Sequence, residues 1–167
     1  MRHINYIKSI SLIIVIFLFT SCSKNTMKPE DFKNKEPRLI IEEYLSGNVK
    51  AWGVLQNRSG KVTRQFSADL DGTWDGKQLI LKENFSWDDG EIQNREWTIN
   101  KIDDNHYEGT AGDVVGKAKG YSYGPAFKFE YVLLVPVKGK EMKITFDDWI
   151  FKQDDRVAIN RATMTKF

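Results

Sequence analysis

The sequence predicts a mostly β protein, an antiparallel barrel or sandwich preceded by one short helix. From Val49 onward, apolar and polar residues alternate with a period of two. Turn-forming stretches such as NRSGK, WDDGE, VKGK and QDDR interrupt this alternation at fairly regular intervals. Short alternating strands separated by such turns are typical of antiparallel sheets that have one packed face and one wet face.

The first 21 residues predict a signal peptide. Arg2 and Lys8 are followed by an apolar run over residues 10–19, which is too short to cross a bilayer. Its end, LFTSC, resembles a bacterial lipobox, in which the cysteine receives a diacylglyceryl group and, after cleavage, an acyl chain. We therefore expect Cys22 to be lipidated and to hold the protein on a membrane. The alternative is an ordinary secretory peptide that leaves Cys22 as a free thiol.

Cleavage before Cys22 leaves one domain's length of chain and no disulfide, because Cys22 is the only cysteine. Residues 22–37 are polar and charged, and we interpret them as the lipid anchor and a flexible tether. Residues 38–167 are then the β-barrel domain. Ser23 replaces the aspartate that often follows a lipidated cysteine, which favours export to the outer membrane, facing the periplasm.

The charge balance argues against a nucleic-acid partner. Once Arg2 and Lys8 leave with the signal peptide, the 25 basic residues fall to 23, equal to the 23 acidic ones. No basic surface is predicted, and so no DNA or RNA partner is expected.

The elements follow in order from Pro37. Leu39, Ile40 and Tyr44 recur at helical spacing before Gly47, which predicts one short helix. The period-two strands begin after it. In residues 61–74 the apolar residues share one face of a strand and the polar residues share the other.

The stretch ENFSWDDGEIQNREW predicts a hairpin with a three-residue loop at residues 88–90. This loop pairs Leu81 with Trp97 and Glu83 with Arg95, all on one face. A two-residue loop would place two glutamates opposite each other. The hairpin therefore predicts an acid–arginine pair among apolar neighbours.

The stretch FDDWIFKQDDRVAINRATMTKF predicts a second hairpin, with Asp154 and Asp155 as a two-residue turn. That register places Asp148 opposite Arg161 on the inner face and leaves Asp147 outside. The four aspartates are then dispersed, which weakens a metal-binding interpretation.

The motifs GTWDG, REW, GTAGDVVG and DDW followed by QDDR and INR resemble those of an uncharacterised family of proteobacterial lipoproteins, known only as a domain of unknown function. The resemblance covers about residues 38–167. It implies a lipocalin-like (calycin-type) antiparallel β-barrel and a lipoprotein, with no established activity. Similar proteins usually continue for one further strand after the TKF at residues 165–167, so closure of the barrel is left open.

Little in the sequence predicts catalysis, a cofactor or a metal. His106 is the only histidine outside the signal peptide, so catalytic triads and zinc sites are not expected. The acidic turns lack the ligand spacing of a calcium-binding EF-hand loop. A carboxylate-based hydrolase or isomerase using Glu83 or Asp113 remains as an alternative, without specific support.

A binding function has more support. The predicted inner face combines aromatic residues with a few charged ones, which suits a fatty acid or another small amphiphile whose carboxylate an arginine grips. The competing interpretations are structural ion pairs in a filled core and an envelope interaction protein that uses its outer face. The candidate ligand-binding residues are Arg64, Glu83, Arg95, Trp97, Asp148 and Arg161. Among them three arginines face two carboxylates, which leaves a surplus of one arginine, and Arg64 has no assigned partner.

Overall fold

The described part of the chain folds as one antiparallel sheet with two single-turn helices before it. The computed structural model describes residues 27–137 and 139–166. The helices are η1 (Pro29–Phe32) and α1 (Ile41–Tyr44). The strands are β1 (Gly47–Gln56), β2 (Val62–Trp74), β3 (Gln78–Trp87), β4 (Ile92–Lys101), β5 (His106–Thr110), β6 (Ala118–Tyr123), β7 (Ala126–Val137), β8 (Lys140–Lys152) and β9 (Ala158–Lys166).

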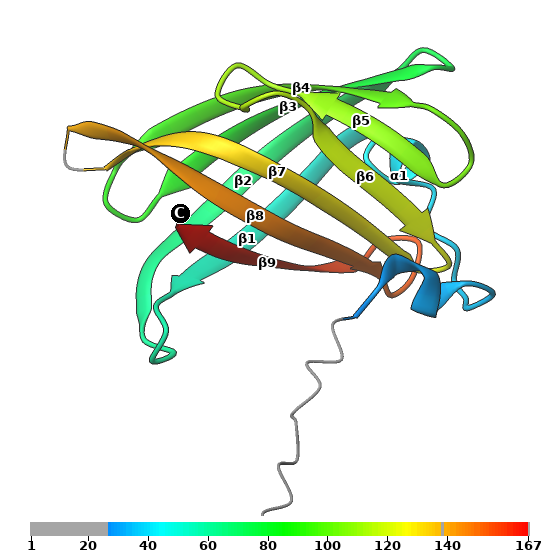
Figure 1. The fold of residues 1–167 in the computed structure, drawn as a ribbon, viewed down its shortest axis with the longest axis horizontal. Coiled ribbons are helices and arrows are strands. Elements are labelled where there is room, and N and C mark those ends of the chain that lie inside the picture. The colour runs from blue at the N-terminus through cyan, green and yellow to red at the C-terminus, as the bar shows by residue number, and fades with distance from the viewer. Residues whose placement is uncertain (1–26, 138, 167) are drawn as a thin grey trace, which may run out of the picture.

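Each strand pairs with its neighbours in the sequence, so the strand order runs from β1 to β9. The sheet curls around an interior, and its two edge strands, β1 and β9, lie on the same side of the molecule (Figure 1). The prediction of a mostly β, antiparallel, lipocalin-like fold is confirmed, in the form of a half-barrel.

One end of the interior holds the apolar core. Leu39, Ile41 and Leu45 from the segment around α1 pack against buried residues of β3 and β7, among them Leu79 and Phe127. The helix predicted here is present as a single turn. It serves to turn the chain so that these side chains fill the end of the half-barrel.

Gly72 of β2 is needed where this segment approaches the sheet. A Cβ atom at Gly72 would overlap the backbone carbonyl of Leu45, so any larger residue must push the two apart. The same segment buries Glu42, which accepts hydrogen bonds from Lys101 Nζ at 2.7 Å and the Tyr107 hydroxyl at 2.8 Å. Burial alone would raise the pKa of Glu42, but these two donors lower it.

The residues before α1 pack on the outside of the sheet. The ring of Phe32 lies 6.0 Å from Trp149 and 5.5 Å from Phe151, both on the outer face of β8. Pro29 is buried, and Gly124 has no room for a Cβ beside the carbonyl of Phe32. Part of the segment interpreted as a tether, from Pro29 onward, is therefore folded onto the domain.

The register predicted for β3 and β4 is confirmed. Glu83 lies opposite Arg95, and Leu81 lies opposite Trp97. The loop between the strands contains Gly90 at φ 86°, a left-handed conformation that glycine adopts without strain.

The register predicted for β8 and β9 is wrong by one residue. Asp148 lies opposite Ala162, and Arg161 lies opposite Trp149 on the outer face, where it is exposed. The cause is the turn: the Asp154 carboxylate accepts hydrogen bonds from the backbone amides of Arg156 at 2.7 Å and Val157 at 2.8 Å. The turn therefore has three residues instead of two, and the slip moves Arg161 to the opposite face.

Candidate functional site

The half of the interior away from α1 is lined by aromatic rings. Trp97 lies 5.0 Å from Phe129 and 5.1 Å from Tyr131, and Tyr131 stacks on Phe146 at 4.9 Å. These residues belong to β4, β7 and β8, whose inner faces meet because the sheet is curled. The result is a wall of rings that crosses the interior from one strand to the next.

Several polar side chains are set into this wall, and Arg95 is at their centre. Its Nη2 lies 2.8 Å from Asp113 Oδ2, and its Nε lies 3.1 Å from Asp113 Oδ1, so the guanidinium grips that carboxylate with two donors. Arg95 Nη1 lies 3.7 Å from Glu83 Oε2. Arg95 therefore links a carboxylate on β3 to one on the loop between β5 and β6.

Asp113 is held in place by its loop. The backbone amide of Leu134 donates to the carbonyl of Asp113 at 2.9 Å, and the amide of Val115 donates to the carbonyl of Val132 at 2.8 Å. These bonds fix the loop along β7. The side chain of Asp113 then points to Arg95 while remaining 34% exposed.

Glu83 is one of the perturbed acids of the interior. Burial raises its pKa to about 7, against the opposing effects of Arg95 and of the indole of Trp97, which donates to Oε2 at 3.2 Å. The negative charges of Asp148 and Asp113 raise the pKa further. Glu83 therefore exchanges its proton near neutral pH.

A second, half-buried acid, Asp148, lies across the interior on β8. It accepts hydrogen bonds from the amide of Asn160 and, at 3.3 Å, from the hydroxyl of Tyr131. Burial raises its pKa, although both donors oppose this effect. Tyr131 is half-buried beside it, and desolvation together with the charge of Asp148 raises the pKa of that phenol.

The interior cluster, defined here as Glu83, Arg95, Asp113, Tyr131 and Asp148, has an excess of acid. Three carboxylates face one guanidinium among these side chains. The sequence-based expectation was the reverse, with a surplus of one arginine. The difference arises because Asp113 joins the cluster whereas Arg161 lies outside it.

Arg64 is also removed from this cluster. It lies on the inner face of β2 near the end of the sheet, where its Nη2 is 2.8 Å from both Asp89 Oδ1 and Glu91 Oε2. Its guanidinium carbon stands 4.0 Å above the ring of Trp87. Arg64 thus has two carboxylate partners and an aromatic ring beneath it, contrary to the expectation that it had no partner, although its Nε is buried without a hydrogen-bond partner.

Four of the six candidate residues come together in the structure: Glu83, Arg95, Trp97 and Asp148. The sequence did not place Asp113, because its position depends on loop contacts with a distant strand. Asn160 was missed because the β9 register was wrong. The predicted lipidation site, Cys22, lies outside the described residues.

Two other features, a metal-binding cluster and a membrane-spanning helix, are absent from the described part of the chain. Within residues 27–137 and 139–166, no group of three or more His, Cys, Asp or Glu side chains could hold a metal ion. The same residues contain no helix long and apolar enough to span a membrane.

Comparison with known proteins gives a family without an assigned activity. No curated protein matches the chain, and no solved structure matches it. Residues 16–167 match a family described as "Protein of unknown function (DUF3833)". The match covers the interior cluster and every strand, and the chain belongs to this family.

Proposed function

We propose that the protein is a membrane-anchored lipoprotein of the bacterial envelope that binds a lipid or another small amphiphile on the inner face of its curled sheet. The supporting observation is an apolar inner surface, left partly uncovered, beside the half-buried interior cluster. Leu55, Phe66 and Phe85 of β1–β3 and Phe146 of β8 are only half-buried, and Met164 of β9 is exposed. Uncovered apolar surface next to a few convergent polar groups is a common property of ligand sites.

An amphiphile fits this arrangement with its tail on the half-buried rings and its head at the interior cluster. The head group expected from the structure differs from that expected from the sequence. Arg95 is already gripped by Asp113, and an ionised fatty acid would meet the carboxylates of Glu83 and Asp148. Like charges in a poorly solvated site repel each other strongly. A neutral or cationic head group is therefore preferred over a carboxylate.

The anchor rests on the sequence. The apolar run before Cys22 and the LFTSC motif support lipidation at that residue, with acyl chains as the contact to the membrane. Ser23, in place of an aspartate after the cysteine, supports localisation at the outer membrane, facing the periplasm.

The proposal is tested by native mass spectrometry of the full-length protein released from membranes in detergent. The expected result is a stoichiometric, non-covalent lipid that dissociates when the chain is denatured, in contrast to acyl chains bonded to Cys22. Dodecylamine, dodecanol and dodecanoate, offered at pH 8, then rank the head groups, with dodecanoate expected to bind most weakly. Arg161→Gln is the matched control, because this arginine lies on the outer face.

A carboxylate-based hydrolase is the second candidate, and one observation favours it. Glu83 has a pKa of about 7, which suits a general base or acid at neutral pH. Turnover of acyl esters by the purified protein, lost in Glu83→Gln, would identify an enzyme. Stoichiometric binding without turnover identifies a binding protein. If neither binding nor turnover is found, the interpretation as an envelope interaction protein remains.

A further inference from the structure

A second surface lies on the outer face of β1–β4, away from the interior cluster. Strand pairing places Trp52, Ser67, Ser86 and Ile92 in one row across these four strands. Trp52 is 74% exposed and Ile92 is 66% exposed, and both serines are exposed as well. With neighbouring strands about 4.8 Å apart, the row is roughly 14 Å long. We call it the outer row.

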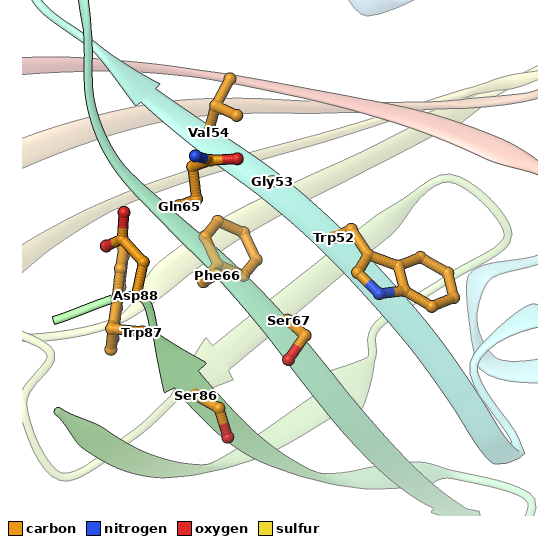
Figure 2. A pocket seen from close by; sticks show the side chains of 9 residues that line it. All are labelled: Trp52, Gly53, Val54, Gln65, Phe66, Ser67, Ser86, Trp87 and Asp88. Atoms are coloured by element: carbon orange, nitrogen blue, oxygen red, sulfur yellow. The ribbon is translucent and has the colours of Figure 1, made fainter. Parts of the chain in front are cut away.

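The outer row borders a shallow depression. Figure 2 shows Trp52 projecting from β1 beside Ser67 of β2, with Ser86 on β3. The depression measures about 760 Å³, and its other lining residues are Gly53, Val54, Gln65, Phe66, Trp87 and Asp88. A second, smaller depression of about 290 Å³ lies over β3 and β4, lined in part by Asn84 and Asn94.

The hydrogen-bonding groups along the outer row are mostly uncharged. They are serine hydroxyls in the row itself and the amides of Gln65, Asn84 and Asn94 beside it. Among the nearby charges, Lys50 Nζ lies 2.7 Å from Asp69 Oδ1, Lys82 lies opposite Glu96 in the strand register, and Asp88 adds a negative charge. A polyanion such as nucleic acid would find no excess of positive charge in this row.

We propose that the outer row binds a neutral oligosaccharide. A sugar ring presents an apolar face that can lie on the exposed indole of Trp52, and its hydroxyls can exchange hydrogen bonds with Ser67 and Ser86. An apolar protein surface docked on the same row would bury these hydroxyls without partners, which is costly. A ligand that carries its own hydroxyl groups satisfies them, so this lining favours a glycan over an apolar protein partner.

The proposal is tested by isothermal titration of the full-length protein with two neutral probes, chitotetraose and cellotetraose. The detergent must carry no sugar head group, since a maltoside would compete for the site. We expect saturable binding of at least one probe in the millimolar range or tighter. Trp52→Ala should weaken that binding by roughly tenfold, and Trp52→Phe should retain part of it.

Two further variants separate the outer row from the rest of the surface. Ser67→Ala combined with Ser86→Ala should weaken binding through lost hydrogen bonds, whereas Thr163→Ala, an equally exposed hydroxyl on the outer face of β9, should not. All of these side chains are exposed, so the thermal midpoint should stay unchanged. Binding of neither probe, or binding that survives Trp52→Ala at full strength, overturns the proposal. The lipid site is unaffected by either result, because it lies on the opposite face of the sheet.

Discussion

Replacing Glu83 by glutamine should remove a specific pH dependence of stability. Glu83 has a pKa of about 7 in the folded protein, raised chiefly by burial from an ordinary value of 4.5. Between pH 4.5 and about pH 7, the Glu83 carboxyl keeps a proton in the folded protein that it has lost in the unfolded chain. Stability contributed by this group is therefore complete below about pH 4.5 and is lost as the pH rises through about 7.

The size of the effect follows from the two pKa values. The full difference of 2.5 units corresponds to about 3.4 kcal/mol of unfolding free energy. Between pH 5 and pH 8 the expected loss is about 2.5 kcal/mol, because part of the titration lies outside that window. Glutamine has a similar shape and retains an oxygen that can accept from Trp97, but it does not titrate.

Urea unfolding of the wild type and of Glu83→Gln, measured from pH 5 to pH 8, tests this reasoning. The difference between the two curves isolates Glu83, because other titrating groups, including the surface aspartates with lowered pKa values, contribute to both proteins. The wild type should lose stability relative to the variant as the pH rises. A difference that stays constant over this range would show that Glu83 is already ionised at pH 5 and that Arg95 outweighs its burial.

Three other outcomes are expected. Arg95→Leu should cost about 2–4 kcal/mol in urea unfolding, less than for a fully buried pair because Asp113 is one-third exposed, and adding Asp113→Leu should recover part of the loss. Arg161→Leu should change the unfolding free energy by less than about 0.5 kcal/mol, since this side chain is exposed on the outer face. Cys22→Ser should abolish acylation, as shown by loss of labelling with a radioactive fatty acid, because the thioether needs sulfur.

The two hairpins show which parts of the fold could be predicted from the sequence. In the β3–β4 hairpin, Gly90 marks the left-handed position of a three-residue loop, and strong apolar partners agree with only one register. The β8–β9 hairpin has no glycine in its turn. The Asp154 side chain sets the turn length by capping two backbone amides, a choice that the sequence DDR does not reveal.

The composition of β9 adds to this difficulty. Its residues are small, polar or only moderately apolar, and nearly all of them are exposed in the structure. A strand without one clearly apolar face does not specify its register, so a slip of one residue could not be detected from the pattern. The misplacement of Arg161 and the failure to predict Asn160 as a partner of Asp148 both follow from this weak pattern.

The candidate site was predictable only where it depends on regular strand pairing. Glu83, Arg95 and Trp97 could be placed together because they lie on neighbouring strands of one hairpin. Asp113 reaches Arg95 from a loop that is fixed by β7, a contact between segments far apart in the chain. No periodicity in the sequence records such a contact. The missed Asp113, together with the misplaced Arg64 and Arg161, turned the expected surplus of arginine into a surplus of carboxylates.

That reversal decides which ligands the proposed lipid site would accept. With a free arginine, the interior would attract a carboxylate; with Arg95 bound by Asp113, the groups left to meet a head group are Glu83, Asp148 and the phenol of Tyr131. A cationic head group would favour the ionised form of Glu83 and lower its pKa, whereas a neutral hydroxyl would leave that proton nearly unaffected. Proton release on binding at pH 6 therefore distinguishes the two: it is expected for dodecylamine and absent for dodecanol, and Glu83→Gln should abolish it while leaving the aromatic wall intact.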